Sequence, residues 1–472
     1  MKKIVIVYGT AQSGIQQKAI ETLTRELLDY TAEYPTCIAA DQPINKELFG
    51  QFIYVGTKEN NPYLANAELA RPTAAEGYAI TVKDGVIYIE GADDAGVLYG
   101  CVDFYAKYIA TKAEYTNKCQ PYWKNPFEND FVLPDFELVS APSISKRGLW
   151  TWGHVIYDYR RYIDNMVKLK MNTVIIWNDF VPVNIKEIIE YAHNSHVEVI
   201  LGYSWGWSQK CDASDMNALA QLTEEILEQY ERDFAHLAID GIYFQSFTET
   251  THKTIGGRLI AEAVTELVNT TANRLLAKHP GLELQFGLHA TSVNDKLQYI
   301  KNTDPRVRIV WEDCGSFPFA YRPTDFADKY EETKVLTRDI ATLRGADERF
   351  GVVTKSFTTL WWGKYFEHQR GSYFMGVSSD AMKTNRIVRK HKEWKYLQAH
   401  WMANCDKAYE IIRLMKECTN GDFYCTALVE DGMFEETIMY HVALYGEMLW
   451  NTEADLNTMM TEVALRDDVT FA

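Results

Sequence analysis

The sequence predicts an α/β protein whose central part is a (β/α)8 TIM barrel, with a small α/β domain before it and a helical region after it. From residue 148 onward, apolar runs of strand length alternate with helical segments at intervals of about 20–45 residues. Eight such runs occupy about 230 residues, the size of a typical barrel of this kind. No glycine-rich phosphate-binding turn follows any run, which disfavours the alternative of a doubly wound open sheet.

Residues 1–140 are predicted to form the small α/β domain, to which we assign a scaffolding role. Asp84-Gly85 separates two β-rich runs, Tyr78–Val82 and Val86–Ile89, and this dipeptide is a strong hairpin signal. Asp93-Asp94 precedes an apolar helix, and an aspartate at that position predicts a capped N-terminus.

The predicted barrel spans residues 148–384. A proline-rich stretch without periodicity, from about residue 115 to about residue 147, is predicted to be the linker that leads into it. The eight predicted strands are Gly148–Trp152, Thr173–Trp177, Val197–Tyr203, Ile239–Phe244, Leu282–Leu288, Val307–Trp311, Gly351–Thr354 and Tyr373–Val377. Residues 385–472 are predicted to be helical and to begin with one long helix over Arg386–Cys418.

Composition excludes several classes of protein. The 472 residues are 47% hydrophobic and 24% charged, which is ordinary globular composition and not that of a disordered chain. A net charge of -17 argues against nucleic-acid and anionic-membrane partners, because phosphate binding needs clustered Lys and Arg. No run approaches the length of about 18 apolar residues that a transmembrane helix needs.

The N-terminus and the cysteines concern the cellular compartment. The apolar run Ile4–Tyr8 stops at Gly9, short of the h-region of a signal peptide, so we interpret it as a first β-strand. A cytoplasmic protein is expected, or one whose leader has been removed and replaced by Met. The eight cysteines show no CxxC spacing and are expected to be buried thiols.

In a barrel of this kind, chemistry belongs at the C-terminal ends of the strands, and aromatic residues gather there. Eight of the 12 tryptophans fall at these predicted ends. A tryptophan ring packs against C–H surfaces and its N–H can donate, a combination that suits sugars, although core packing is the alternative for each ring. The candidate substrate-binding residues at these ends are Trp152, His154, Trp177, Asn178, Tyr203, Trp205, Trp207, His289, Trp311, Lys355 and Trp361.

Three carboxylates at the strand ends are candidate catalytic groups. Glycoside cleavage needs an acid that protonates the leaving oxygen and usually a second carboxylate. Glu249 follows the fourth strand in a polar stretch, and Glu312 and Asp313 follow Trp311 on the sixth. A carboxyl beside an indole can have a raised pKa, which suits a general acid. Because side chains alternate along a strand, at most one of Glu312 and Asp313 is expected to be catalytic.

Metal catalysis is the rival mechanism, and the histidine pattern disfavours it. His154 stands alone on the first strand and His289 on the fifth, with no HxH or HExxH motif in the chain. Both histidines are better interpreted as hydrogen-bonding groups or as core residues. A serine nucleophile is not indicated either, because the GxSxG motif is absent. No cofactor and no metal are expected.

Three short motifs carry a resemblance to known enzymes. They are Gly91-Ala92-Asp93-Asp94-Ala95-Gly96-Val97-Leu98-Tyr99-Gly100, Arg147-Gly148-Leu149-Trp150 with Arg161-Tyr162-Ile163-Asp164-Asn165-Met166-Val167-Lys168-Leu169-Lys170-Met171-Asn172, and Ala443-Leu444-Tyr445-Gly446-Glu447-Met448-Leu449-Trp450-Asn451. With the hairpin before them, they resemble the family 67 α-glucuronidases and, more distantly, the family 20 β-hexosaminidases. The resemblance touches all three parts of the chain.

The resemblance implies a role for Glu249. Family 20 enzymes carry adjacent Asp-Glu after the fourth strand, whereas this chain has Thr248-Glu249, which departs from substrate-assisted chemistry. The α-glucuronidases have a single Glu there as general acid, and Glu249 matches it. Lys355 and Arg322 could bind a uronate carboxylate, since a fixed cation selects an acidic sugar.

The sequence therefore predicts a glycoside hydrolase with a carbohydrate substrate, Glu249 as proton donor and Glu312 or Asp313 as the second carboxylate. The resemblance implies that its activity could be similar to that of an α-glucuronidase. The alternatives are a non-catalytic carbohydrate-binding barrel and a β-N-acetylhexosaminidase-like enzyme. The pattern specifies neither the sugar nor an oligomeric state.

Overall fold

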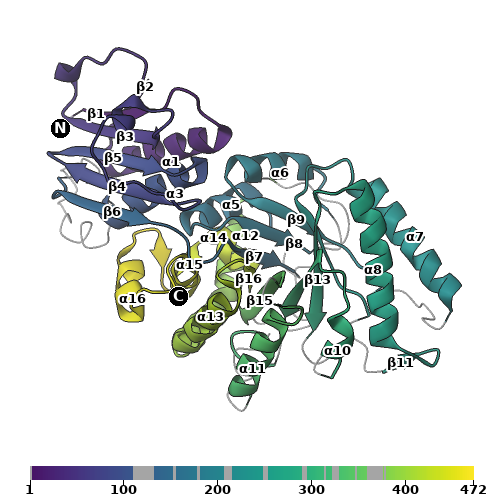
Figure 1. Ribbon diagram of the computed structural model, residues 1–472. Helices are drawn as coiled ribbons and strands as arrows, with labels where there is room; N and C mark the ends of the chain where they lie inside the picture. Colours follow the sequence, from purple (N-terminus) through teal and green to yellow (C-terminus); the bar gives the residue numbers. More distant parts are fainter. Residues whose placement is uncertain are drawn as a thin grey trace.

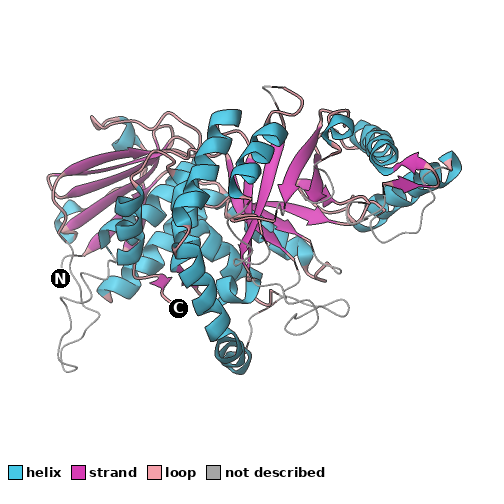
Figure 2. Cartoon of the chain, turned by 90° about the horizontal axis from the view of Figure 1, so that it is seen from below, coloured by secondary structure: helices cyan, strands magenta, loops and turns pink. Residues whose placement is uncertain are grey.

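The structure, a computed structural model, describes residues 3–109, 132–152, 156–177, 181–206, 215–247, 253–289, 295–312, 315–320, 329–345, 348–358, 376 and 379–472. A mixed α/β sheet, a closed barrel of eight parallel strands and C-terminal helices follow one another along the chain, as the sequence predicts (Figure 1). Seen from below, the two largest groups of strands, those of the N-terminal sheet and those of the barrel with its surrounding helices, lie apart from each other (Figure 2).

The N-terminal sheet has six strands in the order β2-β1-β3-β5-β4-β6. These strands are β1 (Ile4–Tyr8), β2 (Thr36–Ala39), β3 (Gln51–Thr57), β4 (Tyr78–Lys83), β5 (Val86–Gly91) and β6 (Phe136–Ser140). β4 runs antiparallel to both of its neighbours, β5 and β6, and the other strand pairs are parallel. Helices α1 (Gly14–Thr31) and α3 (Asp94–Phe104) pack on one face, where their apolar side chains share a core with those of the strands.

Two local predictions for this domain are confirmed. Asp84 and Gly85 connect β4 to β5 with φ angles of 52° and 72°, the left-handed conformation that a two-residue hairpin of this type requires. The Asp93 side chain accepts a hydrogen bond of 2.8 Å from the backbone N–H of Gly96 and so caps α3. The predicted linker contains an unexpected strand, because β6 lies within it and pairs with β4 at the sheet edge.

The barrel strands are β7 (Lys146–Thr151), β8 (Thr173–Ile176), β9 (Glu198–Gly202), β10 (Gly241–Phe244), β13 (Glu283–His289), β14 (Val307–Glu312), β15 (Phe350–Phe357) and β16 (Tyr424–Val429). Pairing of β16 with β7 closes the barrel. Seven of these strands match predicted ones. Their outward side chains form one large core with the helices, and their inward side chains form a second core inside the barrel.

The eighth strand corrects the prediction. The predicted strand Tyr373–Val377 lies outside the described residues except for Gly376, whereas the barrel closes with β16. The barrel therefore continues well beyond the boundary expected at residue 384. A six-residue apolar run that is buried on both faces has no alternation, so periodicity could not identify β16 among helices.

The long helix predicted over Arg386–Cys418 is two helices, α12 (Asp380–Met402) and α13 (Cys405–Thr419), and both precede β16. The other helices around the barrel are α5 (Tyr159–Lys168), α6 (Ile185–Asn194), α7 (Met216–Asp233), α8 (Ile260–Lys278), α10 (Leu297–Ile300) and α11 (Tyr330–Ala341). The chain ends with α14 (Asp431–Glu436), α15 (Tyr440–Trp450) and α16 (Leu456–Leu465). No helix in the described ranges is long and apolar enough to cross a membrane.

Candidate active site

Alternation along the barrel strands decides which side chains reach the interior. The inner core contains Trp150, Ile175, Ile200, Tyr243, Val310, Val353, Tyr424 and Leu428, with Trp152 and Trp177 packed against it. Glu312 lies two residues beyond Val310 and Lys355 two residues beyond Val353, so both continue the inward rows toward the C-terminal ends of their strands. These ends are where barrel enzymes carry their chemistry.

Glu312 is the centre of a buried polar cluster. Its side chain is fully buried, and its Oε2 lies 2.6 Å from the Lys355 Nζ, which is fully buried as well. The Oε1 accepts hydrogen bonds from the Tyr243 hydroxyl and, at 2.6 Å, from the Gln245 Nε2. Residues from β10, β14 and β15, or directly following them, therefore meet at one carboxylate.

The surroundings of Glu312 keep its carboxylate ionised. Burial alone would raise the pKa of Glu312, but the charge of Lys355, then that of His289, and the hydrogen bonds from Lys355 and Tyr243 lower it to about 2. A group with this pKa carries no proton to donate near neutral pH. The expectation that the neighbouring indole raises the pKa of Glu312 is wrong, because the buried ammonium outweighs desolvation.

A glycine makes room for this cluster. Gly287, on β13, faces the interior, where a Cβ would overlap the Tyr243 hydroxyl and lie 2.7 Å from the Glu312 Oε1. The hydroxyl can approach the carboxylate only because Gly287 has no side chain. Tyr243, Gln245 and Gly287 are site residues that the sequence did not predict, and their inward parity on β10 and β13 is the signal that could have found them.

Aromatic rings surround the cluster. The Trp150 ring centroid lies 5.3 Å from the Lys355 Nζ and 5.7 Å from the Tyr243 ring, against which it packs edge-on. Trp177 also packs edge-on against Tyr243, at 5.2 Å, and Trp152 lies 6.1 Å from Trp150. Trp152 and Trp177 are half-buried, so part of each ring remains accessible beside the polar cluster.

Three other predicted aromatic residues face away from the interior. Tyr203, Trp205 and Trp311 are buried in the core between the barrel and its helices. Trp205 stacks on Phe244 with a centroid distance of 3.6 Å. Trp311 and Glu312 are consecutive on β14, so their side chains point to opposite faces of the strand. Because the Glu312 carboxylate points into the barrel, the Trp311 indole points outward. In this arrangement these rings pack the core and do not line the interior.

The remaining predicted residues divide into two groups. His289 is half-buried at the end of β13, in register with Glu312 on β14, and its charge contributes to the lowered pKa of that carboxyl. The others lie outside the described residues, and their roles stay predictions; they are Glu249, Asp313, His154, Asn178, Trp207, Arg322 and Trp361.

Because the eighth strand was predicted at the wrong position, the carboxylate that follows the true eighth strand, β16, was not predicted. Glu430 directly follows β16 and is buried, and its Oε2 accepts a hydrogen bond of 2.6 Å from the Trp394 Nε1 of α12. Its Oε1 lies 3.7 Å from the Lys390 Nζ, also on α12. Glu430 therefore connects α12 to the C-terminal end of the last barrel strand.

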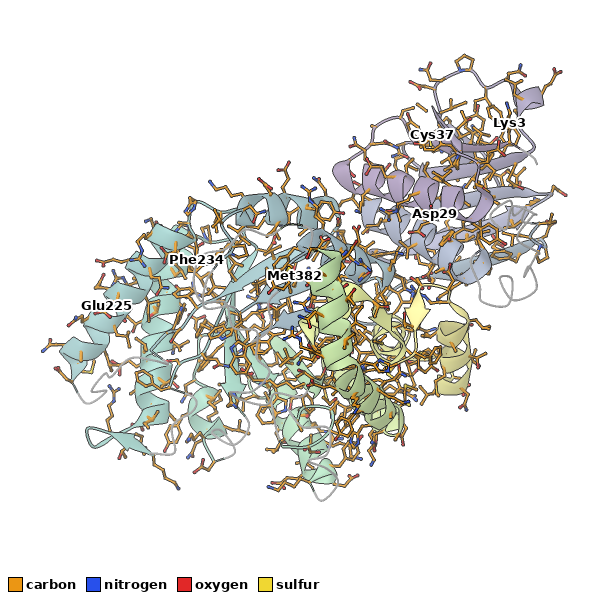
Figure 3. All side chains as sticks on the ribbon, turned by 180° about the vertical axis from the view of Figure 1, so that it is seen from behind. Lys3, Asp29, Cys37, Glu225, Phe234 and Met382 are labelled. Atoms are coloured by element: carbon orange, nitrogen blue, oxygen red, sulfur yellow. The ribbon has the colours of Figure 1, made fainter. Side chains whose placement is uncertain are left out.

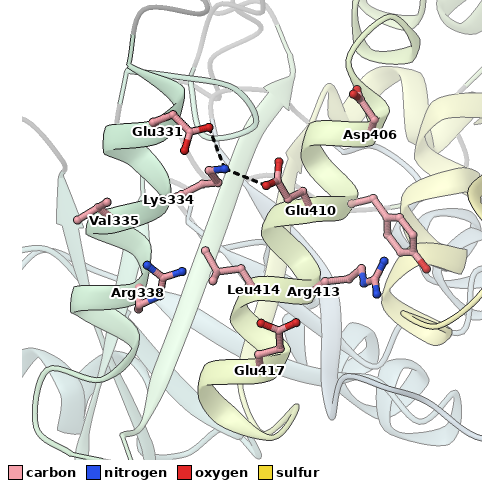
Figure 4. Close-up of a pocket in the computed structure, with 10 residues that line it drawn as sticks. Glu331, Lys334, Val335, Arg338, Asp406, Glu410, Arg413, Leu414 and Glu417 are labelled. Atoms are coloured by element: carbon pink, nitrogen blue, oxygen red, sulfur yellow. Dashed lines mark hydrogen bonds and ion pairs between the residues drawn. The ribbon is translucent and has the colours of Figure 1, made fainter.

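Neither of two further features among the described residues competes with this site. No group of three or more His, Cys, Asp or Glu side chains in that part of the chain is arranged to hold a metal ion. A pocket of about 470 Å³ lies between α11 and α13, on the outside of the barrel (Figure 4). Lys334 crosses it with carboxylate contacts of 2.8 Å to both Glu331 and Glu410, so this ammonium is already paired within the protein.

Comparison with known proteins identifies the fold. No protein-family model and no curated protein sequence matches the chain. The β-N-acetylhexosaminidase from Bacteroides fragilis is 13% identical, with a TM-score of 0.53 and an alignment that covers 96% of this chain and 88% of that one. A GH138 enzyme targeting pectin rhamnogalacturonan II is 12% identical, with a TM-score of 0.52 and coverage of 97% and 52%. CpGH84D is 13% identical, with a TM-score of 0.44 and coverage of 66% and 52%.

The chain thus spans about half the length of two of these three structures. At such low identities the likeness establishes a shared architecture, and it places this chain among proteins with the fold of glycoside hydrolases. The resemblance to α-glucuronidases has no counterpart among these structures.

Proposed function

We propose that this protein is a glycoside hydrolase that acts at the C-terminal end of its barrel. The observation that carries the proposal is the buried, ionised Glu312, held by Lys355 and Tyr243 beneath half-exposed tryptophan rings. Hydrolysis of a glycoside passes through a transition state with positive charge on the sugar, which a fixed carboxylate in a dry site stabilises. The half-exposed Trp152 and Trp177 offer flat apolar surfaces to a sugar ring.

In this proposal Glu249 donates the proton and Glu312 is the second carboxylate. Gln245 donates to Glu312 at 2.6 Å and lies four positions before Glu249, so the chain that leads to Glu249 leaves β10 beside that carboxylate. Glu312 is preferred to Asp313 because its side chain reaches the barrel interior. Its low pKa suits an anion that persists through the reaction and not the proton donor.

The sugar is proposed only by class, a glycan cleaved at an O-glycosidic bond. Selection of a uronate by Lys355 loses its support, because that ammonium is already neutralised by Glu312. A β-N-acetylhexosaminide remains a second candidate, since one structure with this fold is a β-N-acetylhexosaminidase. The absence of Asp before Glu249 argues against an acetamide nucleophile.

The test is hydrolysis of a panel of aryl glycosides that includes uronides and N-acetylhexosaminides. We expect the wild type to release one aglycone, and Glu249→Gln and Glu312→Gln each to lower kcat by about 10²-fold or more. The matched control is Glu225→Gln, on the exposed surface of α7 (Figure 3), which should leave kcat unchanged.

Leaving-group dependence separates the two roles. The Glu249→Gln variant should lose less activity on glycosides with an activated aryl group than on natural glycosides, whereas Glu312→Gln should lose activity on both. Activity that survives Glu249→Gln on both substrates would remove this residue from the mechanism. If the wild type hydrolyses none of the glycosides and calorimetry nevertheless detects binding of a sugar, the protein is a carbohydrate-binding protein instead.

A further inference from the structure

One buried carboxylate holds the loop that leaves the first barrel strand. Glu435, on α14, accepts hydrogen bonds from the backbone N–H groups of Tyr157, at 3.0 Å, and Asp158, at 2.8 Å, the two residues that lead into α5. The Glu435 side chain is 1% exposed. Charge-assisted hydrogen bonds of this kind are about twice as strong as neutral ones, so the carboxylate fixes this stretch of backbone.

An arginine from α12 completes the arrangement. Arg386 donates to Glu435 at 2.8 Å, and its guanidinium lies 4.8 Å from the centroid of the Tyr157 ring. Gly432 leaves room for this arginine, because a Cβ there would lie 2.8 Å from its side chain. The backbone N–H of Gly376 donates to the Tyr157 carbonyl at 2.9 Å. Tyr157 is therefore held through its backbone N–H, its carbonyl and its ring, and α14 lies against both α5 and α12 (Figure 1).

The other end of this loop carries a ring of the candidate site. Trp152 directly follows β7 and lies five positions before Tyr157. It packs against the inner core of the barrel, 6.1 Å from Trp150, which in turn packs on Tyr243. The Trp150 ring also lies 5.3 Å from the Lys355 Nζ. Five residues span at most about 18 Å, so the anchor at Tyr157 restricts where Trp152 can lie.

A neighbouring carboxylate provides a comparison. Glu436 is buried on the same helix and lies 3.9 Å from Arg386. Within the described ranges, its Oε1 has no hydrogen-bond partner. The two glutamates thus share charge, burial and helix, whereas Glu435 is the one that accepts from the loop before α5.

We propose that Glu435 and Arg386 are positioning residues of the candidate site, which fix the Trp152 ring as a wall for the sugar by holding the loop between β7 and α5. This inference rests on the proposed glycoside hydrolase function, because it concerns how the sugar-binding surface of that site keeps its shape. Both residues act through the backbone of Tyr157 and Asp158 and not on the reacting atoms. A displaced Trp152 ring should therefore weaken substrate binding more than the chemical step.

Fluorine NMR of protein labelled with 5-fluorotryptophan reports the position of Trp152 without any substrate. Its resonance is assigned by its absence from the spectrum of Trp152→Phe. We expect Glu435→Gln to shift or broaden this resonance, because the amide has one accepting oxygen for two backbone N–H groups and does not neutralise Arg386. The resonance of Trp205, assigned in the same way, should stay unchanged, because that ring is buried between the barrel and its helices. The matched control, Glu436→Gln, should leave both resonances in place.

A double variant separates positioning from stability. Glu435→Gln leaves the buried Arg386 charge less compensated and should lower the melting temperature. Arg386→Gln combined with Glu435→Gln removes both charges and should recover part of that loss. The loop N–H groups still lack a carboxylate, so the Trp152 resonance should stay displaced in the double variant. A merely structural ion pair would instead return the resonance to its wild-type position together with the melting temperature.

Kinetics connect this position to function. On the aryl glycoside of the panel that the wild type hydrolyses fastest, Glu435→Gln should raise KM about two- to tenfold and change kcat less than about twofold. An unmoved Trp152 resonance in Glu435→Gln, or an equal shift in Glu436→Gln, would overturn the proposal. A displaced resonance with an unchanged KM would overturn the role of Trp152 in binding. If the wild type hydrolyses no glycoside, the proposed function fails, whereas the fluorine spectra still decide whether Glu435 holds Trp152.

Discussion

At the residue scale, the candidate site depends on the absence of one side chain. Gly287 faces the barrel interior at the point where the Tyr243 hydroxyl meets Glu312, and a Cβ there would occupy the position of the hydroxyl. The close approach of hydroxyl and carboxylate is therefore a property of three residues on three neighbouring strands. A substitution at any one of these residues should therefore change the position or the hydrogen bonding of the other two.

Gly287→Ala is expected to displace the Tyr243 ring, remove its hydrogen bond to the buried carboxylate and lower the stability of the fold. Tyr243→Phe removes the clashing hydroxyl, so the double variant should be less destabilised than the sum of the two single changes, by about 1–3 kcal/mol. Urea unfolding of the wild type, both single variants and the double variant measures this coupling. Gly281→Ala is the matched control, because Gly281 is exposed and a Cβ added there would have open space around it. Strict additivity of the two changes would show that the added methyl group does not act through the Tyr243 hydroxyl.

The alternation of side chains between the two faces of a strand explains which residues of the site could be predicted. The inward position of Glu312 follows once the direction of one strand side chain is known, and the same rule then turns Trp311 outward. The sequence places both at a strand end but does not say which of two alternating rows faces inside. The partners of Glu312 could not be predicted, because they come from other strands whose relative register appears only when the barrel is closed.

At the scale of elements, the loop before β4 fastens the N-terminal sheet to the barrel through one residue. Glu76 has a left-handed backbone, with a φ of 59°, and its carboxylate contacts Arg147 at 2.5 Å, Asn172 at 2.8 Å and His196 at 2.8 Å. Burial alone would raise the pKa of Glu76, but the charges and hydrogen bonds of Arg147 and His196 lower it to about 2. The loop is thus held at the starts of three barrel strands, opposite the candidate site.

Glu76→Gln tests this fastening through pH. Because the pKa of Glu76 is lowered in the folded state, its contribution to stability is complete above the unfolded value of about 4.3 and is lost as pH falls toward 2. The variant should be less stable than the wild type by about 3 kcal/mol at pH 7, and the two free energies of unfolding should converge as the solution is acidified. Urea unfolding at several pH values measures both curves, with the exposed Glu68→Gln as control. If the difference in free energy of unfolding between wild type and variant stays constant across the pH range, the ionised form of Glu76 does not stabilise the fold.

Elements with strong local signals are predictable, whereas β16 is not. Seven barrel strands can be found because they recur as apolar runs between helical segments, and the β4–β5 hairpin can be found from its Asp-Gly turn. Two consecutive helices, α12 and α13, separate β15 from β16, so the expected spacing of strands fails there. The edge strand β6 escapes prediction among prolines because it pairs with a single neighbour and alternates over only five residues.

At the scale of the whole molecule, the three motifs that resemble known glycosidases meet at one interface. Asp103 on α3 and Glu447 on α15 both contact the fully buried Lys170 of the barrel, at 2.8 Å and 2.6 Å. Trp450 of the third motif packs edge-on against Tyr99 of the first, with a centroid distance of 5.5 Å, and stacks on Tyr78 of the N-terminal sheet at 5.8 Å. The resemblance is therefore carried largely by residues that join the parts of the fold, which explains why it predicts architecture well and the sugar poorly.

Lys170→Met is expected to uncouple these parts. It leaves two buried carboxylates with fewer cations, Lys107 at 3.0 Å from Asp103 and Arg466 at 3.8 Å from Glu447, and should lower stability by about 3–5 kcal/mol. Residues 3–109 contain no tryptophan, so tryptophan fluorescence reports unfolding of the rest of the chain and, through Trp450, the loss of its contact with the N-terminal sheet. Far-UV circular dichroism also reports the N-terminal sheet itself.

The two signals should change together on heating the wild type and separate in Lys170→Met, because the interface that makes unfolding cooperative has lost its central charge. Lys301→Met, at an exposed position, is the control and should keep the wild-type behaviour. Coincident transitions in Lys170→Met at an unchanged melting temperature would mean that the other contacts, including the packing of Trp450 and the ion pairs of Glu76, hold the sheet to the barrel without Lys170. Separation of the transitions would instead assign that role to the buried ion network, whose members come from the N-terminal domain, the barrel and the C-terminal helices.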